Sequence, residues 1–193
     1  MTTRPRLAPD ERRRLLIDAG ERLFADHDYP AVLMADVAAA AGVSRALLYR
    51  HFPSKRDLFV AVYQRAAGRL LVATTFDASM SLAEQLAAGL DVHFDYFEAN
   101  AHSVLAANKI LIGDPAIQAI ITGELGELRN RILAVLDVEP EARETVSSVL
   151  ASWLTFVRVL TVDWLEHRSC PRPVLRDVCV GAALGALAPL HSR

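Results

Sequence analysis

Two short helical segments joined by a glycine constrain this chain more than any other feature of its sequence. Residues 34–41 are rich in alanine, Gly42 interrupts them, and residues 45–51 follow Ser44, a residue type that caps helix N-termini. Helices this short are not stable alone in water. Each must therefore pack against longer neighbours, and two short helices braced at a steep angle form a helix-turn-helix.

The neighbouring segments supply that support. Residues 9–28 place Leu16, Leu23 and Phe24 at helical spacing, with Pro9 in the first turn, where proline is favoured. Pro53 and Ser54 end the second short helix, and the next is predicted over residues 55–74. Further amphipathic helices are expected at 82–102, 104–112, 115–136, 140–168 and 174–188, with no strand alternation.

The predicted fold is therefore all-α, with about nine helices. A three-helix helix-turn-helix domain over residues 1–54 is expected to precede a larger helical domain over 55–193. The helix at 55–74 links the two. Residues 1–58 carry ten Lys or Arg and eight Asp or Glu, whereas the remainder carries 11 and 15, so the first domain is slightly basic.

Helical geometry predicts the outward face of the second short helix. Each residue turns about 100°, so if Leu48 faces the core, Ala46 and Arg50 lie opposite it, and Arg45 and Tyr49 flank one side. A small residue lets the backbone approach a DNA groove, and Arg pairs bidentately with guanine. The segment therefore has the residues of a DNA recognition helix.

These residues closely resemble the TetR family of repressors. The resemblance covers residues 9–60 and rests on the runs Ala41-Gly42-Val43-Ser44, Leu48-Tyr49, His51-Phe52 and Ser54-Lys55, with Phe24, Tyr29, Val37 and Ala38 in register. It implies base contacts from Arg45, Ala46 and Leu47, and phosphate contacts from Tyr49, His51 and Lys55; Arg50 is suited to either. The full predicted DNA-binding set is Ser44, Arg45, Ala46, Leu47, Tyr49, Arg50, His51 and Lys55.

The sequence departs from the family pattern at three places. Asp28 replaces a common Gly, and Val32 and Leu33 replace threonines that cap the next helix and touch phosphate. Ala46-Leu47 replaces Gly-Thr, so Leu47 offers only an apolar contact, for example to a thymine methyl. The operator sequence therefore cannot be copied from a relative.

The family resemblance also implies a homodimer through the last two helices. The final one is rich in small residues that allow close approach, namely Gly181, Ala182, Ala183, Gly185, Ala186 and Ala188. A palindromic operator requires a two-fold dimer. The alternative is a terminal helix packed inside a monomer.

An effector pocket is predicted among the helices at 82–102, 115–136 and 140–168. Aromatic walls with a few polar groups are typical of sites for small, mostly apolar, possibly ring-containing ligands. The alternative is that this aromatic stripe is ordinary core. The residues predicted to line the pocket are His93, Tyr96, Phe97, Asn100, Trp153 and Phe156.

The sequence predicts neither an enzyme nor a metal or cofactor site. It has no glycine-rich phosphate loop, HExxH or Gly-x-Ser-x-Gly motif, and Cys170 and Cys179 lack metal spacing. The longest uninterrupted apolar stretch, 178–190, is shorter than the roughly 20 residues of a membrane span, so a soluble cytoplasmic protein is expected. The expected function is a ligand-released repressor of a palindromic operator; the alternatives are an activator, or a ligand-binding protein that has lost DNA binding.

Overall fold

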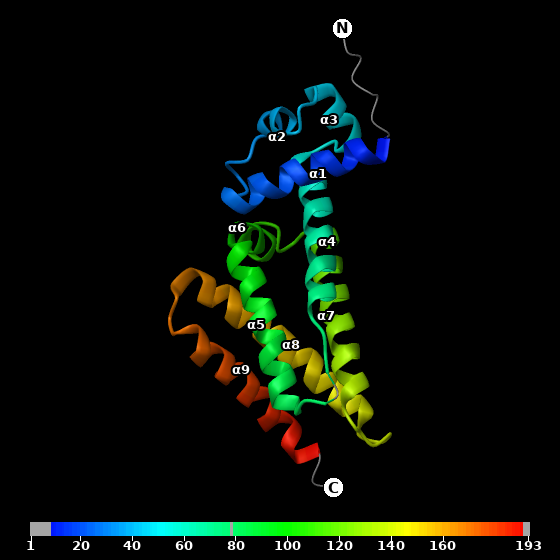
Figure 1. Ribbon diagram of the computed structural model, residues 1–193, viewed down its shortest axis with the longest axis vertical. Helices are drawn as coiled ribbons and strands as arrows, with labels where there is room; N and C mark the ends of the chain where they lie inside the picture. The colour runs from blue at the N-terminus through cyan, green and yellow to red at the C-terminus, as the bar shows by residue number, and fades with distance from the viewer. Residues whose placement is uncertain (1–8, 78, 191–193) are drawn as a thin grey trace.

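The computed structural model describes residues 9–77 and 79–190, and these residues form helices and no strand. Figure 1 shows α1, α2 and α3 grouped at one end of an elongated molecule, and α4 running from them into the body beside α7. The all-α prediction is confirmed. The helices are α1 (Pro9–Asp26), α2 (Met34–Ala40), α3 (Arg45–His51), α4 (Lys55–Ala73), α5 (Leu82–Ala99), α6 (Ala101–Leu105), α7 (Pro115–Val135), α8 (Arg143–His167) and α9 (Arg172–Leu187).

Side-chain caps explain where several helices begin. Ser44 accepts a hydrogen bond from the backbone N–H of Leu47, and Ser54 accepts one from that of Asp57. Ser81 and Glu84 form a reciprocal capping box at α5. Asp114 accepts from two backbone N–H groups at the start of α7. Each cap satisfies backbone donors that have no partner inside the helix.

The chain between α5 and α7 differs from the expected helices at 82–102 and 104–112. The break falls at Asn100, whose side chain donates to the carbonyl of Tyr96 (2.8 Å) and so ends α5. After α6 the helix widens into a π-helical turn, Ala106–Ile110. There the side chain of Asn108 donates to the carbonyl of Val104 (2.7 Å). Two local amide bonds, which periodicity does not reveal, thus shape this segment.

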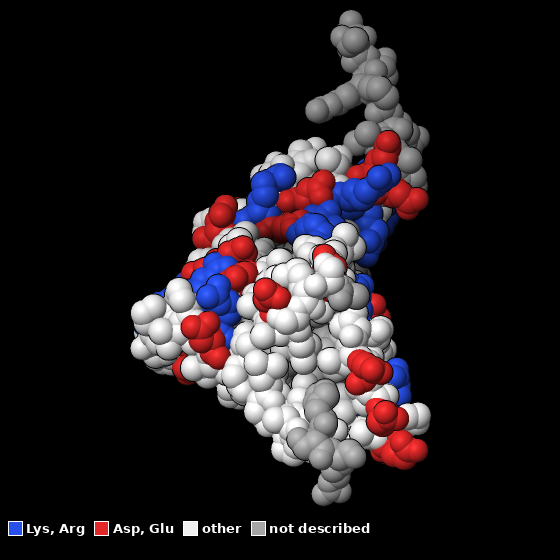
Figure 2. All heavy atoms as spheres, turned by 60° about the horizontal axis from the view of Figure 1, so that its bottom comes forward, with Lys and Arg blue, Asp and Glu red and all other residues white. Residues whose placement is uncertain are grey.

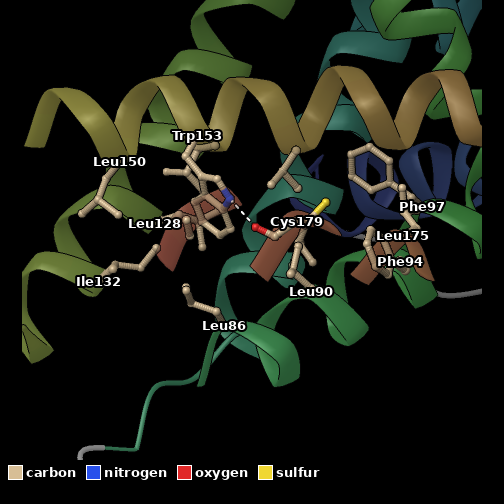
Figure 3. Close-up of a cluster of buried hydrophobic side chains, with 14 of the residues drawn as sticks. Leu86, Leu90, Phe94, Phe97, Leu128, Ile132, Leu150, Trp153, Leu175 and Cys179 are labelled. Atoms are coloured by element: carbon tan, nitrogen blue, oxygen red, sulfur yellow. Dashed lines mark hydrogen bonds between the residues drawn. The ribbon is translucent and has the colours of Figure 1, made fainter. Parts of the chain in front are cut away.

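The hydrophobic side chains form two cores that share α4. The first contains Leu48 and Phe59 and joins α1–α4 to the π-helical turn after α6 and the start of α7. The second contains Phe94 and Trp153 and fills the body between α5, α7, α8 and α9 (Figure 3). Because Phe59 lies in the first core and Leu70 in the second, α4 is a rigid connection between them.

Two segments of the body, Arg143–His167 and Arg172–Leu190, are long and apolar enough to cross a membrane by length and composition alone. A search of the sequence for the longest uninterrupted apolar stretch does not identify these two segments. In the structure α8 packs within the bundle, and 44% of its apolar window is buried. Only 22% of the window beginning at α9 is buried, so this helix has an apolar face that the chain itself leaves uncovered.

Candidate nucleic-acid interface and interior cavity

The face of α3 that points away from the core has the composition expected from its sequence. Leu48 is completely buried, whereas Arg45, Ala46, Tyr49 and Arg50 are exposed, Tyr49 by 48%. Gly42 adopts a φ of 64° in the turn before α3, a conformation that L side chains rarely adopt. The turn therefore directs these four side chains outward together.

The exposed cations of α3 are free to bind an external anion. Among residues 9–77 and 79–190, Arg45 and Arg50 form no hydrogen bond or ion pair. By contrast, Arg56 is paired with Asp114 and Arg65 with Asp18. Figure 2 shows such mixed positive and negative charge over the end of the molecule that carries α1–α3. Two cations without a partner among the described residues therefore lie on α3 itself.

Other predicted contact residues lie at the edge of this face. Ser44 is exposed and caps α3, while Leu47 and His51 are half-buried. The Nε2 atom of His51 is buried and has no hydrogen-bond partner among the described residues. Leu33 is exposed at the N-terminus of α2, where no side chain caps the helix, in line with the loss of threonine there. The Leu33 side chain lines a shallow groove together with Arg45 and Tyr49.

Lys55 has a structural role that the sequence reasoning missed. Its ammonium group donates to the carbonyls of Tyr29 (2.8 Å), Pro30 (3.2 Å) and Val32 (3.1 Å), and lies 4.6 Å from the centre of the Tyr29 ring. Loss of hydration there lowers the pKa of Lys55. The turn between α1 and α2 presents three carbonyls that no helix satisfies, and Lys55 closes it.

An interior cavity of about 50 Å³ lies between α5, α7 and α8, with the last turn of α4 and the segment after it. Figure 3 shows Leu86 and Leu90 of α5, Leu128 and Ile132 of α7 and Trp153 of α8 around this region. Two of the predicted pocket residues, His93 and Trp153, line it. The complete lining is Leu70, Thr74, Phe76, Leu86, Gly89, Leu90, His93, Leu125, Leu128, Ile132, Trp153, Leu154 and Val157.

The four other predicted pocket residues lie elsewhere. Phe97 is buried in the core, with its ring centre 3.9 Å from that of His93. Tyr96 and Asn100 line an open depression between α4 and α5. Phe156, 40% exposed, lines a groove between α8 and α9. Apart from His93 and Trp153, the lining of the interior cavity is mostly Leu and Ile, and sequence periodicity cannot distinguish such residues from ordinary core.

The polar groups of the cavity are few. The hydroxyl of Thr74 is already bonded to the carbonyl of Leu70 (2.9 Å). The Nε2 atom of His93 is buried without a hydrogen-bond partner among the described residues. Burial, assisted by the nearby charge of Arg158, lowers the pKa of His93 to about 3. The imidazole is therefore neutral at physiological pH.

A buried polar cluster joins four elements just beyond the cavity. Arg158 of α8 and Glu124 of α7 are 5% and 4% exposed, with Nη1 and Oε2 3.7 Å apart. Arg158 also donates to Asn108 (3.0 Å) in the π-helical turn and to the Tyr63 hydroxyl of α4. Burial raises the pKa of Glu124, and the charge of Arg158 opposes this shift in part. No sequence motif links these four residues.

Comparison with known proteins places this geometry in context. The family described as "Bacterial regulatory proteins, tetR family" matches residues 16–62. A crystal structure of a TetR-family transcriptional regulator from Streptomyces coelicolor superimposes with a TM-score of 0.84 at 28% identity, covering 96% of this chain and 84% of that one.

Curated relatives are named as transcriptional regulators. The repressor KstR of Rhodococcus jostii is 29% identical over 84% of this chain and 76% of its own length. The activator FasR of Mycolicibacterium smegmatis is 38% identical over 48% of this chain. The match spans only 43% of FasR, so the chain covers less than half of that relative.

Proposed function

The chain belongs to the TetR family of bacterial regulatory proteins, and we propose that it is a repressor that releases a palindromic operator when a small, mostly apolar molecule enters its cavity. The observation that carries this proposal is the outward face of α3, where Arg45, Tyr49 and Arg50 are exposed while Leu48 anchors the helix. The named repressor KstR, which matches most of the chain, favours repression over the activation named for FasR.

In this proposal the residues of α3 divide between bases and phosphates. Arg45, Ala46 and Leu47 read base edges, since base contacts specify sequence. Tyr49, His51 and Lys55 contact phosphates, Arg50 is suited to either kind of contact, and Ser44 belongs to the same DNA-binding set. Because the ammonium of Lys55 is already bound by three carbonyls, its main contribution is to fix the turn before α2, and any phosphate contact adds to that.

The proposed dimer forms through α8 and α9. Phe156, Val159, Val174, Val178 and Leu184 of these helices are exposed, although large apolar side chains are usually covered when they gather on one face. The groove between the two helices contains Ala182 and Ala186 beside Ser148 and Ser152, all small enough for close helix approach. Figure 2 shows a broad area free of charged side chains over the body. A two-fold interface there matches a palindromic operator.

Release by ligand follows from the position of α4. Leu70 and Thr74 near its end line the cavity, and Phe59 near its start lies in the core under α3. The cavity of about 50 Å³ is much smaller than sites for drug-sized ligands, roughly 300–1,000 Å³. A ligand must therefore move the walls apart, which shifts α4 and changes the spacing of the two recognition helices from the 34–36 Å that DNA requires.

Selection of bound DNA from a random pool tests the DNA-binding part of the proposal. The expected product is a palindrome with two half-sites, bound by a dimer in sedimentation analysis. A promoter carrying this palindrome should then be silenced by the protein in a transcription assay. Enrichment of no sequence would contradict operator binding, and stimulation of transcription from every operator position would instead favour an activator.

A further inference from the structure

The interior cavity also limits the chemistry of its ligand. Its side-chain walls are hydrocarbon apart from Thr74, His93 and the indole N–H of Trp153, and the Thr74 hydroxyl and the Trp153 N–H both already donate to backbone carbonyls. That leaves His93, whose Nε2 atom is buried and unpartnered among the described residues. A buried polar atom without a partner is unfavourable, and a ligand that supplies the missing hydrogen bond removes that cost.

The charge of the surroundings excludes an ionised ligand group. No Lys, Arg, Asp or Glu is among the lining residues. The adjacent cation, Arg158, is already paired with Glu124 and donates to Asn108 and Tyr63, so its charge is balanced although its Nη1 atom lacks a hydrogen-bond partner among the described residues. A carboxylate in the cavity would therefore lose its hydration without gaining a counterion, which is strongly unfavourable.

The state of the imidazole determines which uncharged group fits. A neutral imidazole has one N–H donor and one acceptor nitrogen, and either can be at Nε2 depending on the tautomer. A hydroxyl group both donates and accepts, so it can pair with Nε2 in either case. A group that only accepts, such as a carbonyl, fits one tautomer alone.

We propose that the ligand of this cavity is an uncharged apolar molecule bearing a hydroxyl group that bonds to Nε2 of His93. This inference rests on the proposed function in that it takes the cavity as the effector site, and it adds the chemical class of the effector. Trp153 and Phe76 give the cavity flat aromatic walls beside its leucines, so a ring is a suitable apolar body.

Three ring compounds of the same skeleton test the proposal directly: naphthalene, 2-naphthol and 2-naphthoate, measured by equilibrium dialysis against the full-length protein without DNA. We expect 2-naphthol to bind about 3- to 10-fold more tightly than naphthalene, the range for one net hydrogen bond. We expect 2-naphthoate to bind at least tenfold more weakly than 2-naphthol. Equal binding of naphthoate and naphthol, or no binding of any of the three, would overturn the proposal.

Substitutions at the cavity assign the binding to His93. His93→Leu should abolish the preference for naphthol over naphthalene while naphthalene still binds, whereas His93→Gln, which keeps a hydrogen-bonding group, should retain part of the preference. Gly89→Leu is the control for location: a Cβ at Gly89 meets only Thr74, at 3.8 Å, so a larger side chain there fills the cavity and should block all three compounds. An unchanged preference in folded His93→Leu would refute the role of the imidazole.

This experiment separates the two proposals. Operator binding is measured without any ring compound, by gel shift with the selected palindrome. Operator binding without the naphthol preference would leave the proposed function standing and overturn the ligand class. The naphthol preference without operator binding would do the reverse.

Discussion

Removal of the Arg158 side chain tests whether the buried polar cluster is a true charge pair. Arg158→Met keeps a long apolar side chain between the helices but leaves the carboxylate of Glu124, 4% exposed, without its cation. It also leaves the Tyr63 hydroxyl and the Asn108 carbonyl without the guanidinium. Breaking a buried pair from one side typically costs about 3–5 kcal/mol, and we expect this loss of unfolding free energy.

The double variant separates the charge from the packing. Arg158→Met combined with Glu124→Met removes both charges together, and replacing a whole buried pair by apolar groups is often neutral or stabilising. We therefore expect the double variant to recover most of the stability lost by the single one. Urea unfolding at one fixed protein concentration measures both, since the stability of a dimer depends on concentration.

The pH dependence of the single variant provides an independent check. Burial raises the pKa of Glu124, and Arg158 opposes that rise, so Arg158→Met raises the pKa further. An acid whose pKa is higher in the folded state destabilises that state once it ionises. The stability of Arg158→Met should therefore fall as pH rises above the unfolded value near 4.5, up to the raised folded pKa. A loss below about 1 kcal/mol that does not vary with pH would refute this reasoning.

Four further predictions concern the DNA contact, the turn before α2, the dimer and the cavity. Arg45→Ala should weaken the free energy of binding to the selected operator by about 1–3 kcal/mol and relax the preference at one base pair in a competition gel shift. Lys55→Ala should instead lower the stability of the protein in urea. Unchanged stability would contradict the bonds of Lys55 to three carbonyls. Val178→Asp, at a 50% exposed site on α9, should shift the sedimentation coefficient to that of a monomer. The control variant Val72→Asp, at a 79% exposed site on α4, should leave it unchanged. A Val178→Asp protein that remains dimeric would refute the proposed interface. Because the pKa of His93 is lowered to about 3, the folded state loses stability as pH falls from the ordinary value of 6.5 toward 3. His93→Leu should reduce the dependence of the unfolding free energy on pH in this range by about 1.4 kcal/mol per pH unit. An identical dependence in both proteins would show that the imidazole is not shielded from water.

The helices and the face of α3 could be predicted from the sequence because local rules determine them. Proline and serine at helix starts fixed the boundaries of α3 and α4, and the 100° rotation per residue placed Leu48 inward and Arg45 outward. The break at Asn100 escaped prediction because a single side-chain bond to the Tyr96 carbonyl ends that helix. No periodic pattern changes at that position.

The cavity and the polar cluster could not be predicted because they depend on contacts between distant residues. Glu124 and Arg158 are each one of several charges on a long helix, and charged side chains on such helices usually face solvent. Only the packing of α7 on α8 brings them together. Lys55 likewise finds its three carbonyls more than 20 residues earlier in the chain, in a turn whose conformation the sequence did not specify.

The domain formed by α1–α3 meets the body at α4, α6, the π-helical turn and the start of α7, and two of these attachments connect to the cavity. One attachment is α4, which lines the cavity through Leu70. The other is α6, where the Ser103 hydroxyl donates to the carbonyl of Phe24 in α1 (3.0 Å). Since α6 follows α5 directly after Asn100, and α5 also lines the cavity, the expansion proposed above would act on both attachments. Two attachments moved by unequal amounts would rotate the domain, and such a rotation would change the spacing of the two recognition helices in the proposed dimer.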